Sequence, residues 1–195
     1  MSANSLWFTA RGAGLSAMLV LSLAVCLGAL GSVRSRSASN RVVTQYLHRS
    51  AAAVGLALIA VHVGTLVLDN KAHVGLAGAL VPFAAHYRPN AVALGSIAMY
   101  AFMIITALGA ARGRVAASRI GAATWRALHA LSYPAWLVAM AHGLLAGTDR
   151  SQHWVAALTI GCVLAVAAAV TFRLTLLDDD PRQPQQRPSA RGILR

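Results

Sequence analysis

Five long apolar stretches constrain the fold of this 195-residue chain more than any other feature of its sequence. None of them contains Asp, Glu, Lys or Arg, and each is about as long as the roughly 20 residues that a helix needs to cross the hydrocarbon core of a bilayer. The stretches are Gly12–Val33, Ser50–Leu68, Asn90–Ala111, Ala127–Thr148 and Ser151–Phe172. The sequence therefore predicts an all-α fold, an integral membrane helical bundle with five transmembrane helices.

The composition agrees with a membrane protein and excludes several other classes. Hydrophobic residues make up 57% of the chain, charged residues make up 11%, and the mean hydropathy is +0.61. A soluble domain usually carries about a quarter charged residues, so an ordinary cytosolic domain, a disordered chain and a nucleic-acid-binding module are excluded. The net charge of +12 does not indicate a nucleic-acid partner, because the basic residues lie between the apolar stretches. We expect membrane lipid to surround the bundle.

The distribution of arginine predicts the orientation of the bundle in the membrane. The first and third connections between the apolar stretches carry four arginines each, whereas the second and fourth carry fewer basic residues together with Asp69 and Asp149. Short loops rich in Lys and Arg stay on the cytoplasmic side. We therefore expect the N-terminus outside and the C-terminus in the cytoplasm. The arginines of the two basic connections are Arg34, Arg36, Arg41 and Arg49, and Arg112, Arg114, Arg119 and Arg126.

The chain is predicted to form one membrane domain, residues 1–176, followed by a short tail, residues 177–195. The tail is rich in Pro, Gln and Arg and is expected to be disordered and cytoplasmic. Within the second connection, Val74–Phe83 is apolar but too short to span, so we expect it to lie on the outer surface as a cap. Cys26 and Cys162 both lie inside apolar stretches, which indicates neither a disulfide framework nor a zinc site.

Four histidines in or beside the second and fourth apolar stretches are the strongest functional signal, because ionisable side chains are costly inside a membrane. His48 and His62 are 14 residues apart, and His129 and His142 are 13 apart. At a rise of about 1.5 Å per residue, these gaps span about 21 Å and about 19.5 Å. Both helices are predicted to run from inside to outside. His48 and His129 should therefore meet near the inner face, and His62 and His142 near the outer face.

Two imidazole pairs at matching depths are the arrangement that two stacked b-type haems require, with one neutral imidazole on each side of each iron. His48 and His62 share a helix face, because 14 residues fall only about 40° short of four turns. Thirteen residues fall about 140° short, so the second pair needs an irregular helix, and Pro134 can kink or unwind it locally. Gly55 and Trp136 lie near the midpoints of the two pairs.

Other roles for these histidines stay open at this level. A histidine inside a membrane helix often packs or hydrogen-bonds between helices, and ammonium or proton channels also use intramembrane histidines. Zinc or copper is less favoured, since levels about 20 Å apart would give each metal only two protein ligands. His73, His86 and His153 fall in outer connections. They are expected to be solvated loop residues or, alternatively, to receive an electron acceptor.

Four arginines lie close to the predicted histidine levels. Arg11 either extends to lipid headgroups or binds a propionate of an outer haem. Arg88 is a further candidate for a propionate contact. Arg49 and Arg126 lie near the inner histidine pair; ordinary topology charges explain them, and contact with a propionate or a quinone is the alternative.

Two segments that carry the histidines resemble a known family. They are LHRSAAAVGLALIAVHV and WRALHALSYPAWLVAMAHGL. They are similar to the ferric-reductase-like transmembrane domain, the haem-bearing membrane core of ferric reductases, NADPH oxidases and bacterial MsrQ-type proteins. The segments WFTARGAG, VPFAAHYRP and GTD are similar to those of compact actinobacterial members. The resemblance covers about Leu6–Arg173, which is nearly the whole chain apart from the tail.

The resemblance implies a b-type cytochrome of the bacterial plasma membrane, a multi-pass protein with two haem b groups. His48 and His129 would ligate the inner haem, and His62 and His142 the outer haem. Electrons would pass from a cytoplasmic flavin reductase or a quinol to an extracytoplasmic acceptor such as ferric iron or a flavoprotein.

Two departures from the family limit what the resemblance implies. Larger relatives commonly have six spans, whereas this chain shows five, and the flavin- and NADPH-binding module of ferric reductases and NADPH oxidases is missing. We therefore expect an electron-transfer subunit rather than a complete NADPH-dependent enzyme. The alternatives are a haem-free helical membrane transporter or scaffold subunit, and a haem-bearing anchor of a larger redox complex.

Overall fold

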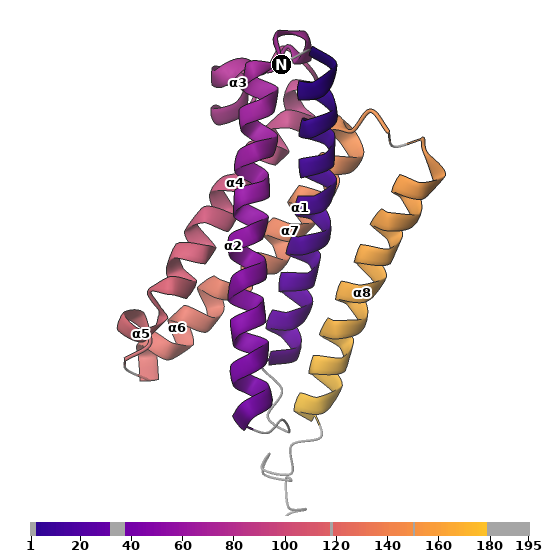
Figure 1. The fold of residues 1–195 in the computed structure, drawn as a ribbon. Helices are drawn as coiled ribbons and strands as arrows, with labels where there is room; N and C mark the ends of the chain where they lie inside the picture. The colour runs from indigo at the N-terminus through magenta and orange to yellow at the C-terminus, as the bar shows by residue number, and fades with distance from the viewer. Residues whose placement is uncertain (1–2, 32–37, 118, 150, 179–195) are drawn as a thin grey trace, which may run out of the picture.

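The computed structural model describes residues 3–31, 38–117, 119–149 and 151–178, and the regular structure of these residues is entirely helical (Figure 1). Among them, five helices run along a bundle and four shorter ones lie toward its ends. The long helices are α1 (Ala3–Gly31), α2 (Ala38–Leu68), α4 (Pro89–Ala110), α7 (Ser132–Ala146) and α8 (His153–Asp178). The short ones are the 3₁₀-helix η1 (Asn70–Ala72), α3 (Gly75–Leu80), α5 (Arg112–Val115) and α6 (Arg119–Ala130). The predicted all-α class is confirmed.

Four of the described helices are long and apolar enough to cross a membrane. They comprise Ser5–Gly31, Ser39–Leu68, Pro89–Ala110 and His153–Thr175. These helices correspond to the first, second, third and fifth stretches predicted from the sequence, and they are consistent with a multi-pass membrane protein. α2 begins earlier than predicted, so Arg41 and Arg49 lie in its first part rather than in a connection.

The fourth predicted stretch is interrupted in the structure. α6 ends at Ala130 and α7 begins at Ser132, and the Leu131 amide donates to the Leu128 carbonyl at 3.1 Å in a tight turn. Pro134 explains the break, because its ring lacks an N–H and clashes with the carbonyl four residues earlier. α7 has 15 residues, fewer than the roughly 20 that a span needs. A fifth continuous span is therefore not confirmed, and the irregularity predicted at Pro134 is present.

α1 is the central helix of the bundle. It packs most extensively with α2 and also contacts α7 and α8, while α4 packs along α7. Figure 1 shows α1 and α2 side by side, with α4 and α7 behind them. α2 is the least covered, since 6% of its apolar window is buried against 39% for α1 and for α4. α2 and α7 therefore belong to one bundle and make their close backbone contacts with α1 and α4 rather than with each other.

A hydrophobic core in the middle of the bundle joins α1, α4, α7 and α8. The indole N–H of Trp136, a residue that is 4% exposed, donates to Ser22 Oγ at 2.9 Å and links α7 to α1. A Cβ at Gly55 would lie 2.5 Å from Leu21 Cδ2, so α2 approaches α1 closely at this position. The buried members of this core are Leu21, Val25, Ala98, Phe102, Ile105, Ala135, Trp136, Met140, Cys162 and Val166.

The end of the bundle at which α1 begins is covered by η1, α3 and the turn that follows them, and we call it the cap end (Figure 1). Ser96 Oγ donates to the Ala79 carbonyl at 2.8 Å, and Tyr100 Oη donates to the Leu80 carbonyl at 2.6 Å. These bonds fasten α3 to α4. The predicted cap Val74–Phe83 therefore folds back onto the bundle.

The opposite end, which we call the arginine-rich end, contains the first part of α2, the last part of α4, α5 and α6. Its exposed arginines are Arg41, Arg49, Arg112, Arg114 and Arg126. Arg34, Arg36, Arg150, the side chain of Arg119 and residues 179–195 of the predicted tail lie outside the described part of the protein.

Candidate functional site

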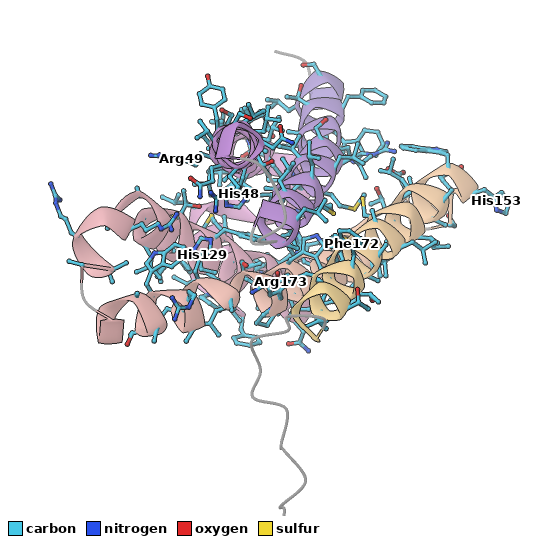
Figure 2. All side chains as sticks on the ribbon, turned by 90° about the horizontal axis from the view of Figure 1, so that it is seen from below. His48, Arg49, His129, His153, Phe172 and Arg173 are labelled. Atoms are coloured by element: carbon cyan, nitrogen blue, oxygen red, sulfur yellow. The ribbon has the colours of Figure 1, made fainter. Side chains whose placement is uncertain are left out.

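The four histidines singled out from the sequence form two facing pairs. His48 on α2 faces His129 on α6, with 6.1 Å between ring centres and 73° between ring planes. His62 on α2 faces His142 on α7, with 6.4 Å and 81°. The first pair lies toward the arginine-rich end, where Figure 2 shows His48 and His129 between their two helices. The second pair lies toward the cap end. The structure brings together the partners and the two levels that the sequence predicts.

The separation of the rings matches that of two imidazoles bound to one metal ion. Metal–nitrogen bonds of about 2 Å on each side of an ion hold the ring centres about 6 Å apart. The same separation lies within the range of edge-to-face ring contacts, about 4.5–7 Å. Ring separation alone therefore fits both a metal centre and a packing contact.

Three of the four rings are held by a backbone carbonyl of a neighbouring helix. The bonds run from His48 Nδ1 to the Ala24 carbonyl at 2.8 Å, from His62 Nδ1 to the Ala10 carbonyl at 2.7 Å, and from His142 Nδ1 to the Ala91 carbonyl at 2.7 Å. Because a carbonyl oxygen only accepts, Nδ1 carries the proton and Nε2 keeps its lone pair in the neutral ring. Metal-binding imidazoles are commonly oriented in this way. The three rings therefore have the tautomer that a metal ligand needs.

His129 is held differently. Its Nδ1 is buried and has no hydrogen-bond partner among the described residues. The ring instead stacks on Trp125, with 4.9 Å between ring centres and 12° between planes. Trp125 is in turn fixed by its indole N–H, which donates to the Leu108 carbonyl of α4 at 3.1 Å. Stacking therefore orients the fourth ring, and its Nδ1 is left unsatisfied.

Four glycines that sequence reasoning did not single out make room for the rings. An added Cβ would lie 2.6 Å from the His142 ring at Gly95, 2.9 Å from the His62 ring at Gly14, 3.2 Å from the His48 ring at Gly28 and 3.4 Å from the His129 ring at Gly109. α1 carries two of these glycines and α4 the other two, and each helix spaces them by 14 residues. The sequence contained this signal as two glycine pairs with the same spacing as His48 and His62.

Two arginines that the sequence proposed as propionate contacts lie at the cap end. Arg11 forms an ion pair with Asp149, which the sequence did not predict, and its guanidinium lies 4.0 Å from the centre of the Trp7 ring. The Nε of Arg11 is buried and has no hydrogen-bond partner in the described part of the chain. Arg88 Nη1 donates to the Leu145 carbonyl at 2.7 Å. Each guanidinium thus has a protein partner close to the cap-end histidine pair.

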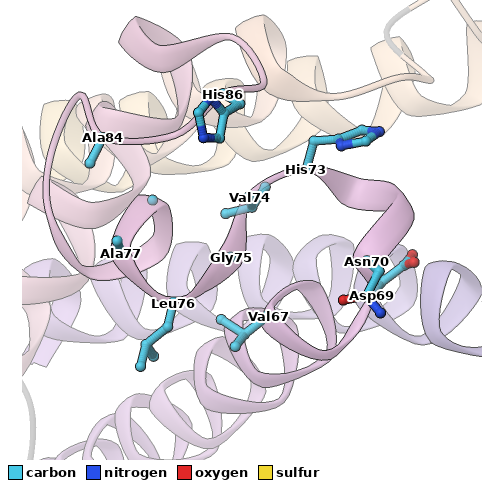
Figure 3. Close-up of a pocket in the computed structure, with 11 residues that line it drawn as sticks. Val67, Asp69, Asn70, His73, Val74, Gly75, Leu76, Ala77, Ala84 and His86 are labelled. Atoms are coloured by element: carbon cyan, nitrogen blue, oxygen red, sulfur yellow. The ribbon is translucent and has the colours of Figure 1, made fainter.

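Two of the remaining histidines line a pocket of about 320 Å³ at the cap end. Figure 3 shows His73 and His86 on one side of this pocket and Val67 and Leu76 on the other. The carboxylate of Asp69, which also lines the pocket, accepts from the Lys71 amide at 3.0 Å. In the ranges that the structure describes, no group of three or more His, Cys, Asp or Glu side chains is placed to hold a metal ion.

The donor set of the two pairs fits haem iron. Haem supplies four nitrogens in a plane and takes one axial ligand on each side, and imidazole is a common axial ligand. α2 presents one ring at each level, and the α6–α7 segment presents the other. The unsatisfied Nδ1 of His129 is consistent with a site whose geometry is completed by a bound group.

Comparisons of this chain with protein-family models, with curated proteins and with solved structures find no match. The function is therefore argued from the geometry of the two histidine pairs and from the sequence motifs that contain them.

Proposed function

We propose that this chain is a membrane-embedded b-type cytochrome that binds two haem b groups and passes electrons across the bacterial plasma membrane. The observation that carries the proposal is the two facing histidine pairs, with ring centres 6.1 Å and 6.4 Å apart, on helices that pack against α1 and α4. The carbonyl-bound Nδ1 atoms of three rings support it further, because they leave Nε2 available as a ligand.

Each histidine would supply Nε2 as an axial ligand. His48 and His129 would hold the haem at the arginine-rich end, and His62 and His142 the haem at the cap end. Haem, when bound, supplies the one-electron carrier at each level. The helices supply the ligands, an apolar environment of low dielectric constant and a fixed distance between the two levels.

Arg11 and Arg88 are proposed to contact propionates of the cap-end haem. Arg11 follows Ala10, whose carbonyl accepts from His62, and Arg88 donates to the carbonyl of Leu145, one turn beyond the α7 histidine. A guanidinium has five N–H donors, so one protein partner does not exhaust its capacity. Bidentate pairing with a carboxylate is a strong interaction for this group.

The exposed arginines favour the arginine-rich end as the cytoplasmic one. Electrons would enter there from a cytoplasmic flavin reductase or a quinol. They would leave at the cap end to an extracytoplasmic acceptor such as ferric iron or a flavoprotein. The resemblance of the histidine segments to the ferric-reductase-like domain supports this direction, and the pocket beside His73 and His86 offers an acceptor a place at the exit.

The first test is a haem count. The protein is expressed with ample haem supply, purified in detergent, and its oxidised and dithionite-reduced visible spectra are recorded with the haem content per chain. We expect a b-type spectrum with a split or broad α-band and two haems per chain. One haem per chain would contradict an electron path between two levels, and a protein without a Soret band would refute the proposal.

A second candidate function is a haem-free helical transporter or scaffold subunit. It is favoured by the near-perpendicular ring planes, 73° and 81°, because edge-to-face contacts of this kind also occur between packed aromatic rings. This candidate predicts that the purified protein has no Soret band and that the histidines line a helix seam.

A further inference from the structure

Each histidine ring rests against a glycine of α1 or α4, and in three cases the same helical turn supplies the carbonyl that holds the ring. Gly14 comes four residues after Ala10, Gly28 four after Ala24, and Gly95 four after Ala91. On a helix, residues four apart lie one above the other, and a side chain covers the turn that precedes its own Cα. A side chain at these glycines would cover the carbonyl, so glycine leaves the carbonyl open to the imidazole.

The fourth ring occupies the same kind of place without the hydrogen bond. A Cβ at Gly109 would lie 3.4 Å from His129 Cε1, and the residue four positions earlier is Ile105. The Ile105 carbonyl is the backbone group that faces His129, although the contact does not reach hydrogen-bond geometry. A small movement of the ring toward α4 would satisfy the buried Nδ1.

We propose that these four glycines are positioning residues for the haem ligands, each keeping a helix carbonyl open to the Nδ1 of one histidine. α1 would serve the two histidines of α2, and α4 would serve those of α6 and α7, with Ile105 as the acceptor for His129. The proposal rests on the proposed function, because it assigns the rings to haem iron.

The spacing of the glycines agrees with this assignment. In an unbroken helix, 14 residues rise about 21 Å and return to within about 40° of the same face. The α1 glycines therefore follow His48 and His62 directly. His129 and His142 are 13 residues apart, and the tight turn at Leu131 supplies the extra rise, about 2.0 Å per residue instead of 1.5 Å, that an unbroken α-helix lacks.

A carbonyl acceptor affects the iron through the ring. It fixes the orientation of the imidazole and makes its Nε2 a stronger donor. A ring pushed off its acceptor binds iron less well and stabilises the ferric state less. The midpoint potential of that haem should then move to more positive values, and its low-spin electron paramagnetic resonance (EPR) signal should change.

The test replaces the glycines one at a time with alanine in the full-length protein. Gly95→Ala and Gly14→Ala, with contacts of 2.6 Å and 2.9 Å, should lose the cap-end haem or shift its potential and EPR signal. Gly28→Ala, at 3.2 Å, should change only the haem at the arginine-rich end, and Gly109→Ala, at 3.4 Å, should have the smallest effect.

Two glycines provide matched controls. Gly12 on α1 and Gly161 on α8 have nothing within 4 Å of an added Cβ, so their alanine variants should keep two haems with wild-type potentials and EPR signals. Alanine also has a higher helix propensity than glycine, so these variants should fold at least as well as the wild type.

The outcomes separate this inference from the proposed function. A wild-type protein without haem refutes the proposed function and the inference with it. A wild type with two haems, whose Gly14→Ala and Gly95→Ala variants match the controls, overturns only the inference. Loss of both haems from Gly28→Ala, the milder substitution, would also overturn it, because a general folding defect rather than one displaced ring would explain that result.

Discussion

The imidazole of His62 has two nitrogens with different partners. Nδ1 donates to the Ala10 carbonyl of α1, and the ring faces His142 across 6.4 Å. The position of His62 in α2 follows from the sequence alone, because the rise of a helix is fixed. The acceptor does not, since it lies 52 residues away on another helix, and its accessibility depends on Gly14 having no side chain.

Removing one ring of the cap-end pair should remove one haem. We expect His62→Ala or His142→Ala to lose the cap-end haem and to retain much of the other, because an iron left with one axial imidazole is bound less tightly. The measurement is the haem content per chain of each purified variant. His153→Ala, at an exposed position at the start of α8, is the control and should keep both haems. Unchanged haem content in both pair variants would contradict the ligand assignment.

The α6–α7 segment shows what an element contributes beyond its residues. From the sequence, 13 residues between His129 and His142 would place the two rings on different sides of one helix, and Pro134 suggested a remedy without giving its form. The structure places the break at Leu131, three residues before the proline, where the backbone bonds to Leu128. The sequence could indicate the irregularity because proline chemistry is local. The exact turn depends on packing against α4, which sequence spacing does not encode.

Restoring helical continuity should disturb the site. In Pro134→Ala the clash with the carbonyl of Ala130 is removed, and a continuous α6–α7 helix would place its two histidines about 140° apart. We therefore expect one of the two haems to be lost or to change its EPR signal, measured on the purified variant beside Pro89→Ala. Pro89 is the first residue of α4, a position where proline fits without breaking the helix, so its replacement should leave both haems in place. Identical haem content and signals in the Pro134→Ala protein would show that the break has another cause.

The molecule as a whole has two unlike ends and a bundle between them. Apolar stretches free of charge predicted four of its long helices, because bilayer thickness sets their length. The order in which the helices pack was not predicted. The pairing of α1 with α2 and of α4 with α7 depends on small residues such as Gly55, whose contact with Leu21 only the folded chain reveals.

The orientation of the whole bundle can be tested by labelling. Ala84 at the cap end and Arg114 at the arginine-rich end are both exposed and are replaced by cysteine one at a time. A membrane-impermeant maleimide should label Ala84→Cys in intact cells and Arg114→Cys only after permeabilisation, because loops rich in arginine stay inside. The wild type is the background control, since Cys162 is buried and Cys26 is half-buried. The reverse labelling pattern would invert the proposed direction of electron flow.

The spacing of the two histidine levels couples the proposed reaction to the voltage of the cell. A rise of about 21 Å along α2 is about two-thirds of a hydrocarbon core about 30 Å thick. Carrying one charge across the full membrane is worth about 2.3 kcal/mol per 100 mV, so an electron moving between the levels would exchange about 1.5 kcal/mol per 100 mV with the field. With a negative interior, the field draws the electron from the arginine-rich end toward the cap end. Each electron exported would therefore partly depolarise the membrane, and an energised cell would supply part of the driving force.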